Sequence, residues 1–266
     1  LKVKNDIISG DTALGIEFGS TRIKAVLIGS DNTPIASGAH EWENRLVDGI
    51  WTYTEEDIIG GMQSCYASLA KEIETKFGIV PTRFGSIGIS AMMHGYMAFD
   101  ENDNLLVPFR TWRNTITGGA SKKLTELFNY PCPERWSISH YYQAILNNEA
   151  HVPQVDFFTT LAGYAHFMLT GKKVLGVGDA SGMFPIDAET GDYDKSMAGK
   201  FDSLVEGKGS AKKLLELLPK AIPAGTDAGK LTKEGALWLD PTGELAEGIL
   251  CAPPEGDAGT GMVATN

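Results

Sequence analysis

Two Gly-rich turns carry residues that could act on a phosphate or on a hydroxyl group. Residues 15–24 include Gly19-Ser20-Thr21, and the backbone N–H groups and hydroxyls of such a turn can cradle a phosphate. Glu17, just before this turn, offers a carboxylate that can hold Mg²⁺ directly or through water. Asp257, within a second Gly-rich segment, could meet a ligand hydroxyl at close range. The same residues also fit an ordinary hairpin turn and a helix N-cap, so neither segment is specific by itself.

Two other segments offer groups that suit a polyol. Met93-His94-Gly95 follows the apolar residues 87–90, and a His at a strand end can hydrogen-bond a hydroxyl. Trp112-Arg113-Asn114 combines an aromatic face with an amide, which could pack on a sugar and bond to it. A satisfied structural His and a hydrophobic loop anchor are the alternatives that these residues leave open.

Hydrophobic periodicity indicates the elements that must position these residues. Short polar turns separate β-rich runs at 13–18, 22–28 and 33–41, which predicts an antiparallel meander of three strands. Thr54 and Asp57 have the spacing of a capping box ahead of apolar residues at helical spacing, which predicts a helix ending near Gly78. We also expect a buried strand at 84–91, a hairpin at 95–105, helices at 118–128, 139–147, 157–169, 211–217 and 231–239, a strand pair within 174–184, a turn-rich connector at 219–229 and a strand at 248–252. These elements predict a mixed α/β domain.

Composition narrows the classes of protein. The 266 residues are 42% hydrophobic, which is enough for a sizeable core. The formal net charge of −11 argues against nucleic acid and anionic membranes as partners, since these attract clustered Lys and Arg. No apolar run approaches the roughly 20 residues of a membrane span, and residues 1–11 lack the pattern of a secretory signal. The 3 cysteines are far apart, so we expect a cytoplasmic protein without disulfides.

Several familiar nucleotide and metal motifs are absent or incomplete. Residues 176–181 approach a dinucleotide fingerprint, but Ser181 takes the place of its third Gly and Pro185 falls where a helix should run. No P-loop sequence occurs, and the 5 His residues lack the spacing of a metal site.

In their order and spacing, these segments resemble the FGGY family of carbohydrate kinases, whose fold is the ribonuclease-H-like fold of the actin-like ATPases. The resemblance extends over the family's N-terminal, sugar-binding domain, for which we take the whole of residues 1–266. Met-His-Gly at 93–95 is most like the xylulokinase branch. Other matching segments are Gly-Ile-Glu-Phe-Gly-Ser-Thr at 15–21, Trp51, Leu-Thr-Gly at 169–171, Asp-Ala-Ser-Gly-Met-Phe at 179–184, Gly-Asp-Tyr-Asp at 191–194, Leu-Pro at 218–219 and Gly-Asp at 256–257.

The resemblance implies a role for each matching residue. Asp257 would be the catalytic base that takes a proton from a sugar hydroxyl as its oxygen attacks the γ-phosphate of ATP. Mg²⁺ would accompany ATP, with Glu17 as the residue nearest the metal. The sugar pocket would contain Met93, His94, Gly95, Trp112 and Asn114, and the phosphates would face Gly19, Ser20, Thr21, Lys24 and Gly256.

The sequence departs from the family pattern at three points. Glu17 stands where the family usually has Asp, which leaves the metal contact open. Asn114-Thr115-Ile116 lacks the Arg that often follows the Trp, and Arg135 is a candidate to replace it. The family's C-terminal nucleotide-binding lobe is absent from this chain, so we expect residues 1–266 alone to bind ATP poorly and not to turn over. Which sugar and which hydroxyl react, and whether the protein forms a homodimer, stay open.

Two competing interpretations come from other functional classes. A non-catalytic sugar-binding or regulatory module would explain Glu17 and the missing Arg, but it has no need of Asp257. An actin-like or chaperone-like ATPase would use the hairpin phosphate loop, but it has no need of a pocket made by Met93, His94 and Trp112.

Overall fold

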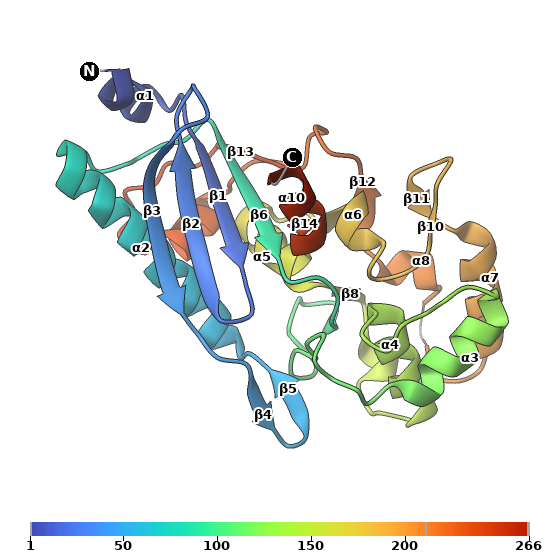
Figure 1. The fold of residues 1–266 in the computed structure, drawn as a ribbon. Helices are drawn as coiled ribbons and strands as arrows, with labels where there is room; N and C mark the ends of the chain where they lie inside the picture. Colours follow the sequence, from blue (N-terminus) through green and yellow to red (C-terminus); the bar gives the residue numbers. More distant parts are fainter. Residues whose placement is uncertain (1, 211, 265–266) are drawn as a thin grey trace.

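The computed structural model of the chain describes residues 2–210 and 212–264. One hydrophobic core lies between the central sheet and its helices, and a second lies within a mainly helical part beside it. Figure 1 shows the sheet on one side of the molecule and α3 (Gly118–Phe128), α4 (Ser137–Leu146) and α7 (Lys195–Val205) on the other.

The central sheet confirms the predicted meander and extends it with parallel strands. Its order is β13-β6-β1-β2-β3, with β14 also paired to β6. The β1–β2 and β2–β3 pairs are antiparallel, whereas β6 runs parallel to β1, β13 and β14. The bounds are β1 Ala13–Phe18, β2 Arg22–Ile28, β3 Pro34–Glu41, β6 Ser86–Ala91, β13 Leu250–Cys251 and β14 Glu255–Gly256.

The sheet buries one face and leaves part of the other open. Alternate side chains of β1 and β2 are buried, as expected for strands with a period of two. The buried side chains pack against α2 (Glu55–Phe77) and α5 (Leu161–Thr170). A Cβ atom on Gly38 would lie 2.2 Å from the carbonyl oxygen of Cys65, so only Gly allows α2 to cross β3 this closely. Gly15, Glu17 and Lys24 lie on the opposite, more open face.

Helix α2 begins and ends where the sequence predicts. The Thr54 hydroxyl accepts a hydrogen bond from the Asp57 N–H, and the Asp57 carboxylate accepts one from the Thr54 N–H. At the other end, Gly78 has a φ of 69° and closes the helix in the left-handed conformation. This capped helix fixes the direction in which the chain enters β6.

Smaller elements complete the fold. Within the described residues, two-stranded sheets join β4 to β5, β7 to β8, β9 to β12 and β10 to β11. Their bounds are β4 Arg45–Val47, β5 Ile50–Thr52, β7 Met97–Phe99, β8 Phe157–Thr159, β9 Val174–Gly176, β10 Ile186–Asp187, β11 Asp192–Tyr193 and β12 Lys220–Ile222. The remaining helices are α1 Lys2–Ser9, a 3₁₀ turn Val152–Gln154, α6 Val177–Ala180, α8 Leu214–Leu217, α9 Lys233–Leu239 and α10 Asp257–Ala264.

Several local predictions were wrong in extent or in partner. The predicted helix at 157–169 begins with strand β8, since Thr160 caps α5 by accepting from the Gly163 N–H. The expected strand pair within 174–184 is instead β9 followed by α6, and β9 pairs with β12. Strand β12 lies inside the predicted connector at 219–229, and the pairing is invisible to local periodicity because the two strands are far apart in sequence.

Other boundaries differ by a few residues. The turn of the predicted hairpin at 95–105 forms, but β7 makes its strand pairing with β8. The helix expected at 211–217 covers only Leu214–Leu217, and Ala211 lies outside the described residues. The helix expected at 139–147 is α4, which begins at Ser137, and the strand expected at 248–252 narrows to β13.

Candidate active site

The site forms where three strands of the sheet end together. Phe18 of β1 and Gly256 of β14 are both in register with Ala91 of β6, and all three strands run in the same direction. The residues that follow each strand therefore meet at one edge of the sheet. Figure 1 shows β14 and α10 beside the end of β6. This parallel arrangement brings the Gly19 turn, the Met93 loop and Asp257 together.

A cavity of about 290 Å³ lies at this edge. Its lining includes Ser20, Met93, His94, Trp112 and Asp257, which were assigned roles in the site from the sequence, and Arg135, the candidate replacement for the missing Arg. Met92 and Ala258 complete the lining. The cavity thus contains a carboxylate, an imidazole, a hydroxyl, an aromatic ring and a guanidinium, which together can bind and deprotonate a polyol.

Asp257 is exposed at the first position of α10. Its Oδ1 accepts a hydrogen bond from the Met93 N–H at 3.2 Å, which ties the carboxylate to the loop after β6. The Ser90 and Thr260 hydroxyls lie 2.8 Å apart and fasten α10 to β6 from the same side. One hydrogen bond thus orients the carboxylate and another contact fixes its helix, while the second carboxylate oxygen stays available to accept a proton.

His94 is held in a strained loop that fixes its ring. It has a φ of 70°, and Gly95 follows with a φ of 90°. A Cβ on Gly95 would lie 2.7 Å from the Phe109 ring, so this position needs Gly. The ring Nδ1 is 3.2 Å from the Gly182 carbonyl oxygen. Because a carbonyl only accepts, Nδ1 carries the hydrogen and donates it.

The electrostatic environment keeps His94 neutral. Burial lowers the pKa of His94 and the Arg135 charge lowers it further, whereas the Gly182 bond and the Asp257 charge act in the opposite direction without reversing the shift. With Nδ1 donating to Gly182, the neutral ring keeps Nε2 as a hydrogen-bond acceptor. An acceptor at this point suits a hydroxyl group of a bound polyol.

The turn between β1 and β2 is held by its carbonyl groups. Trp42 Nε1 donates to the Gly19 carbonyl at 2.7 Å, and the Tyr53 hydroxyl donates to the Ser20 carbonyl at 2.6 Å. The Trp42 N–H donates to the Thr21 carbonyl, and the Trp42 and Tyr53 rings stack with centroids 4.0 Å apart. The carbonyls of the turn are thus engaged on one side, and exposed Ser20 contributes to the cavity on the other.

A second cavity, of about 480 Å³, lies on the open face of the sheet. Glu17 and Lys24 both line it and form an ion pair at 3.6 Å. Its floor contains Gly15 and Gly88, above which a Cβ would meet no atom within 4 Å. Asp257 lines both cavities, so this carboxylate stands between the polyol groups and the Glu17–Lys24 pair.

The donor set of the second cavity fits a hydrated Mg²⁺ ion. Carboxylate oxygens of Glu17 and Asp257 face the same space, and Mg²⁺ is commonly bound through one or two carboxylates together with waters and phosphates. Over residues 2–210 and 212–264, no group of three or more His, Cys, Asp or Glu side chains is placed to hold a metal alone. An ion here would therefore depend on phosphate oxygens for part of its coordination.

Some of the predicted residues lie behind the cavity walls. The buried Asn114 side chain accepts from the Trp51 N–H and donates to the Trp51 and Thr111 carbonyls, so the structure does not bring it into the cavity. Gly256 lies under Met93, since a Cβ there would be 2.2 Å from Met93 Cγ. Gly95 is likewise a support of the His94 loop. Gly19 and Thr21 form the turn next to Ser20.

Sequence reasoning missed a buried carboxylate behind Asp257. Asp179 is fully buried, its Oδ2 accepts from the Thr160 hydroxyl at 2.6 Å, and its N–H donates to Glu255 Oε2 at 3.0 Å. Oδ1 has no hydrogen-bond partner among the described residues. Burial raises the pKa of Asp179 to about 7, and burial also raises the pKa of Glu255. Its sequence signal was an Asp within the Gly-rich segment 176–182, but its burial depends on distant residues.

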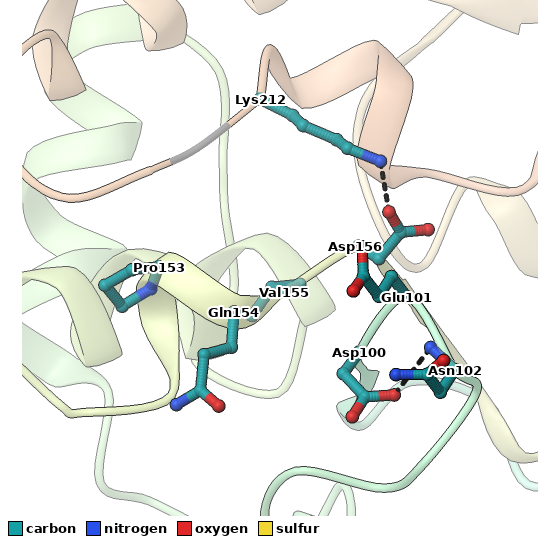
Figure 2. A pocket seen from close by; sticks show the side chains of 8 residues that line it. All are labelled: Asp100, Glu101, Asn102, Pro153, Gln154, Val155, Asp156 and Lys212. Atoms are coloured by element: carbon teal, nitrogen blue, oxygen red, sulfur yellow. Dashed lines mark hydrogen bonds and ion pairs between the residues drawn. The ribbon is translucent and has the colours of Figure 1, made fainter.

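Another hollow, which shares no lining residue with these two cavities, lacks these features. Figure 2 shows it between Asp100, Asn102, Gln154 and Lys212. Lys212 pairs with Asp156, and Asp100 accepts from the Asn102 N–H at 2.9 Å. Because these charged groups already have partners, nothing in this hollow indicates chemistry.

Two broader observations bear on the protein class. In the part of the chain that the structure describes, no helix combines the length and apolar character needed to cross a membrane.

Cys65, Cys132 and Cys251 are free and buried, and burial raises the pKa of each thiol. These thiols are therefore inert core residues.

Comparison with known proteins identifies similar sequences and folds. Residues 12–240 match the model of the FGGY family of carbohydrate kinases, N-terminal domain. Gluconokinase from Bacillus subtilis (strain 168) is 30% identical over 118 residues, which are 44% of this chain and 22% of that protein. Gluconate kinase from Lactobacillus acidophilus has a TM-score of 0.75 at 18% identity, covering 92% of this chain and 48% of its own.

A xylulose kinase from Rhodospirillum rubrum has a fold about as similar to this chain as the gluconate kinase has. Its TM-score is 0.77 at 17% identity, with 93% of this chain and 50% of that chain covered. The two structures confirm the predicted fold class. The chain spans about half the length of each of them.

Proposed function

Because the chain belongs to the FGGY family of carbohydrate kinases, we propose that it is the sugar-binding lobe of an ATP-dependent kinase with Asp257 as general base. The observation that supports this most directly is the shared cavity of Asp257, His94 and Ser20 at the ends of β1, β6 and β14. In this position the carboxylate can take the proton of a substrate hydroxyl as that oxygen attacks the γ-phosphate.

Each residue around the cavity has a part in this proposal. The Met93 N–H orients Oδ1 of Asp257, which leaves the other oxygen to accept the proton. His94 Nε2 accepts a hydrogen bond from a second hydroxyl and so fixes the orientation of the substrate. The half-exposed Trp112 ring packs on the carbon chain of the sugar. Only binding in this orientation places the reacting hydroxyl at Asp257.

ATP and Mg²⁺ would be bound on the other side of Asp257. The Gly19 N–H donates to the Arg22 carbonyl, so the turn would face the transferring phosphate with the N–H groups and hydroxyls of Ser20 and Thr21. Lys24 would compensate phosphate charge. Glu17 would hold Mg²⁺, which neutralises the charge that builds up on the phosphates. Gly256 keeps this region narrow enough for Asp257 to reach both ligands.

The nucleotide would need a second lobe. The similar structures are about twice as long as this chain, so about half of each has no counterpart here. We therefore propose that a C-terminal lobe of the same protein completes the ATP site, and that residues 1–266 alone do not turn over. Closure of two lobes would exclude water from the phosphate transfer.

Two groups of substrates are candidates within the family. Xylulose or a related ketose or polyol is suggested by the Met-His-Gly segment, and gluconate is suggested by the relatives named above.

A non-catalytic sugar-binding module is the competing function, but it does not account for a base that is oriented by a backbone N–H and exposed to the cavity.

A coupled ADP-release assay on the full-length protein tests the proposal. Mg²⁺-ATP is combined with ketoses, aldoses, polyols and aldonates, and wild type is compared with Asp257→Asn. We expect carbohydrate-dependent turnover that falls by about 10³-fold or more in the variant, with an unchanged melting temperature because Asp257 is exposed. Saturable sugar binding without turnover in wild type would instead establish the binding module.

A further inference from the structure

Arg135 is built into the wall of the Asp257 cavity. The Gly95 N–H donates to the Arg135 carbonyl at 3.2 Å, and the Ser137 hydroxyl donates to the Gly95 carbonyl at 2.5 Å. These bonds fasten the segment around Arg135 to the loop that carries His94. The backbone of Arg135 is therefore fixed relative to the His94 loop, and its exposed side chain extends from this fixed point into the cavity lining.

The charge of Arg135 is not compensated within the described residues. Arg110 pairs with Glu149 and Arg45 with Asp57, but Arg135 has neither an ion pair nor a side-chain hydrogen bond in residues 2–210 and 212–264. The neighbouring Glu134 carboxylate lies beside Gly118, 3.6 Å from where a Cβ of that residue would be. The guanidinium is exposed, and its hydrogen-bond donors are available to a ligand.

A second Arg close to the cavity, Arg113, already has a partner. Arg113, next to the cavity residue Trp112, lies over the Trp51 ring with its Cζ 3.6 Å from the ring centroid. That contact occupies its face and turns it away from the cavity lining. Among the described residues that line the 290 Å³ cavity, Arg135 is then the one Lys or Arg, beside the neutral His94.

We infer that the substrate is an aldonic acid, a polyhydroxy carboxylate whose carboxylate pairs with Arg135 while a distant hydroxyl reaches Asp257. This inference rests on the proposed kinase function and specifies its substrate class. The cavity contains the Arg135 guanidinium and the Asp257 carboxylate. An aldonate offers a carboxylate for the first and, at its other end, a nucleophilic hydroxyl for the second. A planar guanidinium can hold a carboxylate through two parallel hydrogen bonds.

A neutral ketose matches this cavity less well. Closing the site around it would remove water from Arg135 without supplying a counter-ion, and an unpaired buried charge is costly. The reaction itself is unchanged by the carboxylate. The bond between the γ-phosphorus and the bridging oxygen of ATP breaks to release ADP, the substrate oxygen bonds to that phosphorus, and its proton goes to Asp257.

Kinetics with matched substrates on the full-length protein test the inference. D-Gluconate and D-glucitol differ at one end, a carboxylate against a neutral hydroxymethyl group, and D-xylulose serves as the ketose. We expect wild type to favour gluconate over glucitol by about 100-fold in kcat/KM. Arg135→Gln should raise the KM for gluconate by about 100-fold, leave kcat and the KM for ATP within about threefold, and leave glucitol unaffected. Arg135→Lys should recover only part of the loss, because its ammonium lacks the planar fork.

Lys122→Gln is the matched control, since it removes one positive charge from an exposed position on α3. We expect it to leave every constant unchanged. Faster turnover of D-xylulose or glucitol than of gluconate would overturn the inference while keeping the kinase function. A rise in the KM for ATP, and not for gluconate, in Arg135→Gln would assign the guanidinium to a phosphate instead and also overturn it. Absence of turnover with every carbohydrate would overturn the proposed function and the inference with it.

Discussion

The candidate site has two layers of side chains, an exposed front layer that lines the cavity and a buried rear layer that packs behind it. The front layer consists of Ser20, His94, Trp112, Arg135 and Asp257, which line the cavity. The rear layer consists of Thr160, Asp179, Tyr193 and Glu255, and of these Asp179 is fully buried. Chemistry needs side chains that a ligand can reach, whereas the position of those side chains depends on what packs behind them.

The contact between the two layers runs through Gly256. This residue follows Glu255 and precedes Asp257, and a Cβ on it would lie 3.0 Å from Met93 Sδ and 3.1 Å from Asp179 Oδ1. The front carboxylate and the rear carboxylate are thus separated by a backbone without a side chain. A close approach of this kind is expected to be intolerant of substitution.

Gly256→Ala is the sharpest test of this separation. The added Cβ would overlap Met93 Cγ, at 2.2 Å, and must push either the Met93 loop or β14. We expect kcat/KM to fall by about 100-fold, because small displacements of a catalytic group are costly. Stability should fall by about 1–3 kcal/mol, the usual cost of overpacking. Steady-state kinetics and denaturant unfolding measure the two effects.

Gly259→Ala on α10 is the control for that substitution. A Cβ at Gly259 would meet nothing within 4 Å, and Ala favours the helix over Gly. It should therefore leave activity unchanged and stability equal or higher. If both variants behaved alike, the layers would not be coupled through Gly256.

Asp179→Asn tests whether the rear carboxylate carries a proton. Burial raises the pKa of Asp179 to about 7 from an ordinary 3.8, and the Glu255 and Asp257 charges act in the same direction. A raised folded-state pKa stabilises the fold below the unfolded pKa, and this contribution is lost as the pH rises through the folded pKa. Wild type should therefore lose stability between about pH 4 and pH 8 by more than the variant does.

Thermal unfolding of both proteins from pH 5 to pH 8 measures this difference. Asn keeps the shape and can still accept from the Thr160 hydroxyl, so its turnover at pH 7 should fall by no more than about tenfold. Glu255, whose pKa is also raised by burial, is present in both proteins, so the effect of its own burial is common to the two. Melting temperatures that run parallel over this range would show that Asp179 does not titrate there.

The two layers were not equally predictable from the sequence. Ser20, His94 and Asp257 of the front layer lie just after strands, so the ends of the runs at 13–18 and 84–91 located the Ser20 turn and the His94 loop. Asp179 drew attention only as part of an incomplete dinucleotide pattern and of the family-like segment 179–184, and it was given no role of its own. Its role depends on burial against Thr160, Tyr193 and Glu255, and such long-range contacts leave no local period in the sequence.

The same distinction applies to the fold. The meander and α2 follow local rules, since a capping box and alternation can be read within a few residues. The β9–β12 pair joins segments that are far apart, and Asn114 was assigned to the ligand although its amide is used by the backbone of Trp51. Helix α7 was missed although Asp194 caps it and Ala198, Phe201 and Val205 bury one side, so a signal was present there.

Tyr53→Phe tests the support of the phosphate turn and should have the smallest effect. The Tyr53 hydroxyl donates to the Ser20 carbonyl at 2.6 Å, and the ring stacks on Trp42, so the substitution removes one hydrogen bond and keeps the stack. We expect a stability loss of about 1 kcal/mol and a rise of about two- to fivefold in the KM for ATP, with the sugar KM unchanged. Tyr66→Phe is the matched control, because the buried Tyr66 hydroxyl has no partner among the described residues and its removal should cost nothing. A rise in the sugar KM in Tyr53→Phe, without one for ATP, would mean that the turn supports the front layer and not the phosphate, and equal effects of the two variants would mean that the Ser20 bond does not hold the turn.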